Sequence, residues 1–377
     1  MAGPSLRALG LMSGTSMDGI DAAILDSDGD RISSFGPTSY QPYSAEDRAV
    51  IRKAMDAAQQ MAAYDDTVEV VQQAESLITE RHQSIVSKML SEHGPVDLIG
   101  FHGQTIFHAP DRGVTIQIGN GQSLADGAGT DVVFDMRSND VAHGGQGAPL
   151  APVFHRAVAN HLGLDLPVAL INIGGVANVT WIGPDGIGPG GIGPDGQLLA
   201  CDTGPGNALM NDWVKRHTGA DYDADGALAS QGQLDEMALA ALLDNSYFSM
   251  GWPKSLDRDA FSLAPVEHLT LADGVTTLAA FTVRSIVDGL RQCPQMPMKI
   301  VIVGGGAHNP VLLEMLGAEL ASQVVPMGTL GLEPDFIEAQ AFAYCAIRSK
   351  KDMPITFPGT TGCPSPLPGG KFASPRA

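Results

Sequence analysis

The chain has 377 residues, of which 44% are hydrophobic, enough apolar side chains to build two domains with separate cores. Its 42 acidic and 22 basic residues give a net charge of -20, which argues against nucleic acid or an anionic membrane surface as a partner. No apolar run is long enough to span a bilayer, no signal peptide is evident, and the four cysteines are scattered, so we expect a protein of the reducing cytoplasm.

The first part of the chain predicts three strands followed by helices, and then two more strands. The pattern of apolar residues places strands at 6–12, 20–26, 31–39, 96–108 and 131–136, and helical segments within 45–92 and at 121–129. A glycine-rich turn, 14–19, joins the first two strands.

The second part repeats this plan. Strands are expected at 168–174, 179–183, 197–204 and 299–306, and helices at 207–219, 233–245, 277–291, 310–321 and 338–350. The repetition predicts an α/β fold of two duplicated halves with a cleft between them. We expect residues 1–137 with 350–377 to form the first half, 138–349 to form the second, and the tail after 354 to be extended.

The opening turn is a candidate phosphate-binding site. Glycines let the backbone approach a ligand, Thr15 and Ser16 supply hydroxyl groups, and Asp18 and Asp21 could hold Mg²⁺ or its waters. An ordinary polar hairpin is the alternative. A similar turn in the second half, with Gly174, Gly175 and Asn178, favours two turns that bind the phosphates of a nucleotide from both sides. No G-x-x-x-x-G-K-[ST] motif occurs.

A third glycine-rich turn follows the strand at 299–303. Gly304, Gly305 and Gly306 precede Asn309, which we expect to cap a helix that has Pro310 in its first turn. A helix N-terminus approached through glycines suits a ribose, an adenine or a phosphate. A tight strand–helix turn that serves packing explains the pattern equally well.

Asp202 is the candidate general base. It ends an apolar strand just before the turn "TGPGN", and a carboxylate at such a place can accept a proton from a reacting group. Capping of the turn by its own side chain is the alternative. The neighbouring Cys201 is expected to pack in the core.

Other polar residues at strand ends are candidates for binding a substrate. His102 and Gln104 could donate to and accept from a polyol. Arg137 suits a substrate carboxylate, with an ion pair to Asp135 or Asp140 as the alternative. Glu338 could reach either a ligand or neighbouring groups.

Three copies of a five-residue unit, "IGPDGIGPGGIGPDG" at 182–196, match G-x-G-x-x-G at 186–191 and 191–196. The dinucleotide-binding motif requires a helix after its last glycine, whereas a strand follows here. We therefore interpret the segment as an enlarged hairpin loop.

In this order, the motifs "GLMSGTSMDGIDAA", "FHGQTIFH", "DMRSND", "GGQGAPLAP", "INIGGVANVT", "DTGPGN", "VGGGAHNP" and "EAQAFA" resemble the anhydro-N-acetylmuramic acid kinase family. The resemblance covers nearly the whole chain. It implies the actin-like ATPase fold of hexokinases, acetate kinases and heat-shock chaperones. It also implies a homodimeric bacterial enzyme of cell-wall sugar recycling, whose substrates are ATP and anhydro-N-acetylmuramic acid.

The family reaction opens the 1,6-anhydro ring with water and phosphorylates the freed 6-oxygen, giving N-acetylmuramic acid 6-phosphate and ADP. By resemblance, Asp202 activates the water, Asp18 and Asp202 are candidates to hold Mg²⁺, and the sugar contacts are His102, Gln104, Arg137 and Glu338. The implied ATP-binding residues are Gly14, Thr15, Ser16, Met17, Asp18, Gly19, Ile20, Asp21, Gly174, Gly175, Asn178, Gly304, Gly305, Gly306 and Asn309.

The chain departs from the family pattern in two places. The five-residue repeats enlarge a hairpin that is usually short. "PKSLDRDAF" replaces the usual "PKSTGRE", which leaves the roles of Lys254 and Arg258 open.

Two other functions are weighed against this one. The first is a kinase of the same fold that acts on a different sugar or on an acid. The second is a non-catalytic, ATP-gated sensor, against which the absence of a client-binding or DNA-binding segment argues.

Overall fold

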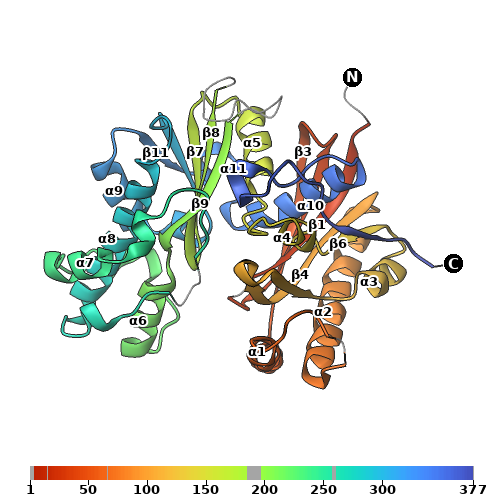
Figure 1. Ribbon diagram of the computed structural model, residues 1–377, viewed down its shortest axis with the longest axis horizontal. Helices are drawn as coiled ribbons and strands as arrows, with labels where there is room; N and C mark the ends of the chain where they lie inside the picture. Colours follow the sequence, from red (N-terminus) through yellow and green to blue (C-terminus); the bar gives the residue numbers. More distant parts are fainter. Residues whose placement is uncertain (1–3, 15, 66, 185–196, 257–259, 377) are drawn as a thin grey trace. The chain divides into compact units, whose positions relative to one another are not determined.

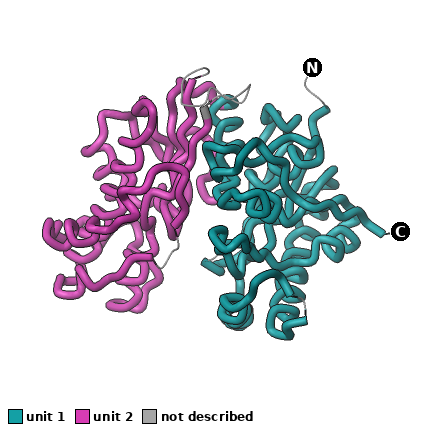
Figure 2. The backbone as a smooth tube through the Cα atoms, in the orientation of Figure 1, with its two compact units in different colours: residues 1–161, 336–377 teal, residues 162–335 magenta. Residues whose placement is uncertain are grey.

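The computed structural model describes residues 4–14, 16–65, 67–184, 197–256 and 260–376, and the chain forms two compact units (Figure 2). Unit 1 comprises residues 1–161 and 336–377, and unit 2 comprises residues 162–335. These bounds differ from the expected division at 137/138 and 349/350. At the second boundary, the helix Ile337–Lys350 (α10) packs on the sheet of unit 1. At the first, the helices Ser138–Ala142 (α4) and Pro152–His161 (α5) also contact strands of that sheet.

Unit 1 is built on a seven-stranded mixed sheet with the order β12-β6-β4-β1-β2-β3, in which β5 also pairs with β4 (Figure 1). The first three strands form an antiparallel meander, whereas β4 runs parallel to β1, and β6 runs parallel to β4. The strands are β1 Leu6–Ser13, β2 Gly19–Ser27, β3 Ile32–Pro42, β4 Leu98–Ala109, β5 Val114–Ile118, β6 Val132–Phe134 and β12 Lys371–Ala373. The helices are α1 Ala45–Ala58, α2 Glu69–His93, α3 Gly121–Ala128, α4 Ser138–Ala142, α5 Pro152–His161, α10 and α11 Pro358–Thr361.

The two faces of this sheet carry different side chains because successive residues of a strand point to opposite faces. Leu9 and Leu11 of β1 join a buried core with the apolar residues of α1 and α2. Gly10 and Gly100, which are register partners, lie against α10 instead. A Cβ atom at either position would overlap a backbone carbonyl oxygen of α10, so glycine is what permits this close approach.

Unit 2 repeats the plan with a five-stranded sheet in the order β11-β10-β7-β8-β9. Its first three strands are again antiparallel, and β10 and β11 are parallel to β7. The elements are β7 Val168–Ile173, β8 Val176–Gly183, β9 Gln197–Pro205, β10 Lys299–Val303, β11 Gln323–Pro326, α6 Ala208–Thr218, α7 Glu236–Leu243, α8 Leu271–Leu290 and α9 Pro310–Glu319. The repeated strand order confirms the predicted α/β fold with duplicated halves.

Helix α8 is apolar and almost fully buried within unit 2, where it packs against β9, α6, α7 and α9. No helix in the described part of the chain combines the length and the apolar run that a membrane span requires.

The structure adds several short elements to the prediction, among them β5, β11, β12 and α5. Strands β8 and β9 pair as a hairpin around the five-residue repeats, up to Gly183 opposite Gln197. Positions 185–196 of the repeats lie outside the described residues.

Candidate functional site

The opening turn is shorter than the family motif that contains it. Gly19, Ile20 and Asp21 belong to β2, and the Ile20 side chain is fully buried in the core, so it cannot contact a ligand. Ser16 and Asp18 are exposed at the turn. Thr15 lies outside the described residues.

Backbone geometry closes this turn. Met17 adopts a positive φ of 57°, and its N–H donates to the Gly14 carbonyl at 3.1 Å. The Asp18 carbonyl accepts from the Tyr43 N–H and the Tyr40 hydroxyl, both at 2.9 Å. The main chain of Asp18 is therefore fixed, while its side chain faces solvent.

Gln104 holds the start of the turn. It is fully buried, its Oε1 accepts from the Ser13 hydroxyl at 2.5 Å, and its Nε2 donates to the Gly14 carbonyl at 3.0 Å. The Ser13 oxygen also lies 2.9 Å from the hydroxyl of buried Tyr43. Gln104, a candidate sugar contact, is thus buried and supports the opening turn through these hydrogen bonds.

His102 lies close to Gln104 on β4, just after the last residue of β4 that pairs with β6, Phe101. His102 and Gln104 lie within β4 and not at its end. Gly103, between them, has a positive φ of 71°. The buried His102 ring has its Nδ1 2.8 Å from the Gly103 carbonyl, so Nδ1 carries the hydrogen. Its Nε2 accepts from Arg137 Nε at 3.0 Å. Burial, together with the Arg137 charge, holds the pKa of His102 well below its usual range, so the ring is neutral.

Arg137 is oriented by a second contact, from its Nη1 to the Gly147 carbonyl at 2.8 Å. The loop that carries Gly147 is fixed by the buried Asp140 carboxylate, which accepts from the Gly147 N–H and the Thr361 hydroxyl, each at 2.7 Å. Asp140 therefore supports Arg137 through the loop.

Glu338 is in the first turn of α10, and its side chain is accessible to solvent. Desolvation of its carboxyl raises the pKa of Glu338, and the positive charge of Arg137 opposes this effect. The charge of Arg137 thus acts on both Glu338 and His102, and all three residues belong to unit 1.

In unit 2 the glycine-rich turns meet at the strand ends. The carbonyls of Gly174 and Gly175 accept from the N–H groups of Asn207 and Gly206, at 2.7 and 2.9 Å. Asn207 Nδ2 donates to the Ile173 carbonyl at 2.9 Å. These hydrogen bonds connect the turn that links β9 to α6 with the turn that links β7 to β8.

The turn after β10 lies beside them. Gly304 has a φ of 72°, and a Cβ there would overlap the side chain of Asn172. Asn309 caps α9 as predicted, because its Oδ1 accepts from Val311 N at 3.0 Å. Gly305 and Gly306 belong to a single 3₁₀ turn, Gly305–His308, that precedes the helix.

Asp202 lies on β9, opposite Asn178 of β8, at a register shift. Such a bulge re-aims a side chain, and bulges are common beside active sites. The half-buried carboxylate accepts the Leu256 N–H on its Oδ2 at 2.8 Å, and the Asp202 N–H donates to the Lys254 carbonyl at 3.0 Å. Cys201 is fully buried in the core of unit 2, and burial raises the pKa of its thiol, which agrees with the predicted packing role.

A family model described as anhydro-N-acetylmuramic acid kinase matches residues 6–372. The chain belongs to the anhydro-N-acetylmuramic acid kinase family.

Relatives that carry the family name are similar along nearly their whole length. The anhydro-N-acetylmuramic acid kinase of Methylobacterium nodulans is 45% identical over 384 residues, which cover 98% of this chain and 100% of the relative. That of Rhizorhabdus wittichii is 46% identical over 371 residues, which cover 97% of this chain and 98% of the relative.

Two solved structures with similarity to this chain have low sequence identity to it. The activator of the 2-hydroxyisocaproyl-CoA dehydratase from Clostridium difficile, with bound ADPNP, is 14% identical with a TM-score of 0.45, over 92% of this chain and 96% of that one. An inorganic polyphosphate/ATP-glucomannokinase from Arthrobacter sp. strain KM is 12% identical with a TM-score of 0.39, over 92% and 99%. At these values the likeness supports no conclusion about function.

The structure of this anhydro-N-acetylmuramic acid kinase family member also reveals contacts that the sequence patterns did not indicate. Ser13 and Tyr43 join the Gln104 network, and Tyr247 contacts Asp202. No motif marks Tyr43 or Tyr247, since each meets its partner through the fold. Arg258, whose role was left open, lies outside the described residues.

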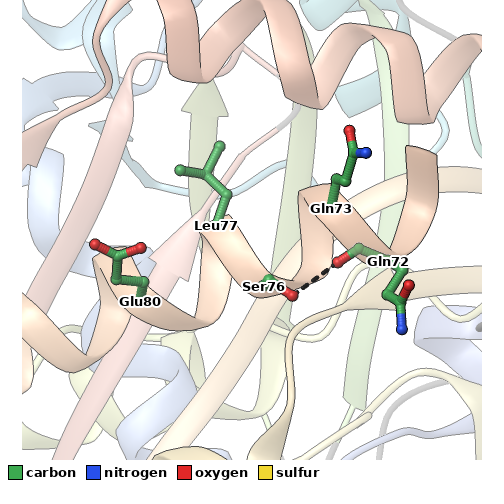
Figure 3. A pocket seen from close by; sticks show the side chains of 5 residues that line it. All are labelled: Gln72, Gln73, Ser76, Leu77 and Glu80. Atoms are coloured by element: carbon green, nitrogen blue, oxygen red, sulfur yellow. Dashed lines mark hydrogen bonds between the residues drawn. The ribbon is translucent and has the colours of Figure 1, made fainter. Parts of the chain in front are cut away.

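A shallow depression of about 370 Å³ lies on α2, away from these motifs in the sequence (Figure 3). Its lining consists of Gln72, Gln73, Ser76, Leu77 and Glu80. Among the described residues, all the lining side chains belong to this one helix, so we assign the depression no role in the family reaction.

Proposed function

We propose that the chain is an ATP-dependent kinase that hydrolytically opens the 1,6-anhydro ring of anhydro-N-acetylmuramic acid and phosphorylates the 6-oxygen. The products are N-acetylmuramic acid 6-phosphate and ADP. The observation that carries this proposal is the family match over residues 6–372, together with identities of 45% and 46% to kinases of that name. A kinase for another sugar or acid, or an ATP-gated sensor, is not favoured by this match.

Asp202 is the proposed general base. Its carboxylate takes a proton from water as the water oxygen bonds to the anomeric carbon. The bond from that carbon to the 6-oxygen breaks, the 6-oxygen bonds to the γ-phosphorus, and the bond from the γ-phosphorus to the β,γ-bridging oxygen breaks to release ADP. The proton leaves Asp202 for solvent, so the atoms and charges balance. The Leu256 N–H on Oδ2 supports this role because it fixes the orientation of the carboxylate.

The glycine-rich turns are the proposed nucleotide contacts. Backbone N–H groups of glycine-rich turns can bind phosphate groups without basic side chains. This suits a chain in which 42 acidic residues outnumber 22 basic residues. We assign Gly14–Asp18, Gly174–Gly175 and Gly304–Gly306 to ATP. Buried Ile20 and the capping Oδ1 of Asn309 support these contacts without making them.

Mg²⁺ is the proposed metal, with Asp18 and Asp202 as its candidate protein ligands. Mg²⁺ usually binds one or two carboxylates together with phosphates and waters, and the exposed Asp18 carboxylate fits that donor set. Within the described residues, no group of three or more His, Cys, Asp or Glu side chains could hold a metal by itself. When bound with the nucleotide, Mg²⁺ would neutralise charge on the β- and γ-phosphates.

Arg137, His102 and Glu338 are the proposed sugar contacts. A guanidinium held by two hydrogen bonds can bind the carboxylate of the muramic acid side chain with little loss of side-chain entropy. Gln104 is proposed to act indirectly, through Ser13 and Gly14. The resemblance also leads us to propose a homodimer in the bacterial cytoplasm.

The test uses Mg-ATP, anhydro-N-acetylmuramic acid and ¹⁸O-labelled water, with wild type beside Asp202→Asn. We expect mass spectrometry to find a phosphorylated sugar with one ¹⁸O on the anomeric carbon, ADP in equal amount, and a large fall in the amount of both products in Asp202→Asn. A sample of N-acetylmuramic acid 6-phosphate in the same water controls for exchange of the anomeric oxygen.

The alternatives give other products. Phosphorylated anhydro-sugar or another phosphorylated acceptor without ¹⁸O would indicate a kinase that does not couple hydrolysis to transfer. Inorganic phosphate with ¹⁸O and no sugar phosphate would indicate plain ATPase activity. Binding of ATP without any ADP would support the sensor.

A further inference from the structure

A segment that comes later in the chain contacts β9 at Asp202, near the end of the strand at Pro205. Strand β9 is an edge strand of its sheet, and residues 254–256 form hydrogen bonds with it at Asp202. The Asp202 N–H donates to the Lys254 carbonyl, and the Leu256 N–H donates to the Asp202 carboxylate. One oxygen of the carboxylate is thus held by the main chain of this segment.

Tyr247 binds the carbonyl group of Asp202, whereas the carbonyl of Lys254 accepts from its N–H group. The Tyr247 hydroxyl donates to the Asp202 carbonyl at 2.6 Å, and the tyrosine is 8% exposed. Breaking this hydrogen bond would leave the hydroxyl of a buried tyrosine without this partner, which is costly, so the bond favours one geometry. Burial and the Asp202 charge raise the pKa of Tyr247, so its hydroxyl is protonated and can donate at neutral pH.

Lys254 links these two supports. It is only 5% exposed, its Nζ donates to the Tyr247 carbonyl at 3.0 Å, and the same nitrogen lies 4.3 Å from the centre of the Tyr247 ring. Burial lowers the pKa of the lysine, and Cys201 opposes this effect.

A buried ammonium group is costly, and an apolar side chain of similar size would fill the same space at no such cost. The lysine is therefore better explained by what it holds than by packing. It ties together Tyr247 and the segment that binds the Asp202 carboxylate.

We propose that Tyr247 and Lys254 are positioning residues for Asp202, an inference that rests on the proposed function of that aspartate. Tyr247 takes no part in the chemistry itself: its hydroxyl fixes the Asp202 carbonyl, and the Lys254 segment fixes the Asp202 N–H and Oδ2, so together they hold the carboxylate that takes the proton from water. Neither residue touches substrate in this role. A misplacement of about 1 Å in a reacting group can cost roughly 100-fold in rate, so such support is required.

The test compares Tyr247→Phe and Lys254→Met with wild type in the ATP and anhydro-sugar assay. Tyr247→Phe keeps the ring and removes only the hydroxyl group. We expect kcat to fall roughly 10- to 100-fold in both variants, with the KM values for ATP and for the sugar unchanged. Tyr222→Phe and Lys215→Met are matched controls in the same unit. Tyr222 is 63% exposed, and Lys215 forms a surface ion pair with Asp221, so neither control should change kcat.

A double variant separates positioning from general structural damage. In an Asp202→Asn background, Tyr247→Phe should cause no further loss of residual activity, because it acts through the aspartate. An additive loss there would overturn the inference. So would a wild-type kcat in Tyr247→Phe, and this variant decides the matter even if Lys254→Met does not fold.

The failure of the proposed function would look different. A wild-type kcat in Asp202→Asn alone would remove Asp202 from the chemistry, and the positioning roles with it. Loss of activity in Asp202→Asn beside unimpaired Tyr247→Phe and Lys254→Met would leave the proposed function standing and refute the positioning roles.

Discussion

Gly206→Ala tests the junction of the turns in unit 2. An added Cβ would overlap the carbonyl oxygen of Gly174 and lie 3.0 Å from its carbonyl carbon and from that of Val176. These are backbone atoms, so no side-chain rotation can relieve the overlap, and the turn has to move. The hydrogen bonds from Gly206 N to Gly175 O, at 2.9 Å, and from Asn207 N to Gly174 O, at 2.7 Å, would lengthen with it.

The cost follows from these contacts. Overpacking costs about 1–3 kcal/mol and each lost hydrogen bond about 0.5–1.5 kcal/mol, so we expect the free energy of unfolding to fall by about 2–6 kcal/mol. For a unit of this size, each kcal/mol shifts the unfolding midpoint by about 2–4 °C, so the midpoint should fall by at least about 4 °C. If the turns bind ATP as proposed, the affinity for a non-hydrolysable ATP analogue should also fall by tenfold or more, about 1.4 kcal/mol.

The assays are thermal unfolding by circular dichroism and titration calorimetry with the analogue. Gly317→Ala is the matched control, since it lies in α9 with open space around the added Cβ. Alanine there should stabilise the helix by about 0.5–1 kcal/mol. The reasoning is refuted if Gly206→Ala unfolds at the temperature of Gly317→Ala or above it.

Two further predictions concern buried polar groups of unit 1. Gln104→Leu removes one of the two hydrogen-bond partners of the Ser13 hydroxyl and one of those of the Gly14 carbonyl, so we expect a loss of about 1–3 kcal/mol in stability and a KM for ATP raised about tenfold, measured by denaturant unfolding and steady-state kinetics. Burial lowers the pKa of His82 from 6.5 to about 4, so between these values the unfolded state binds more protons and stability falls as the pH falls. Wild type should lose roughly 2–3 kcal/mol more than His82→Leu between pH 7 and 4.5, measured by denaturant unfolding at each pH.

Each of these predictions has a clear contrary result. Gln72→Leu changes an exposed glutamine of α2 and should leave the KM for ATP unaltered, so equal KM values in Gln72→Leu and Gln104→Leu would contradict the supporting role. Parallel pH profiles of wild type and His82→Leu would show that protonation of His82 does not oppose folding.

The candidate site was only partly predictable from the sequence. The glycine-rich turns, the Asn309 cap and the strand that ends near Asp202 are signalled by residues adjacent in the chain. The supporting contacts are not local. Gln104 reaches Ser13 because β4 pairs with β1 in one register, and Tyr247 reaches Asp202 across 45 positions.

What the sequence by itself determined is the repeated plan of the fold, because alternating and helical apolar patterns and turn residues act over a few positions. The family also followed from motifs in order along the chain. Only the tertiary structure decided that α10 belongs to unit 1, since the evidence lies in Gly10 and Gly100, more than 200 positions earlier. It also decided which polar groups support the opening turn and Asp202. Hydrogen bonding and close backbone approach depend on distance in space, and strand register and helix packing set that distance.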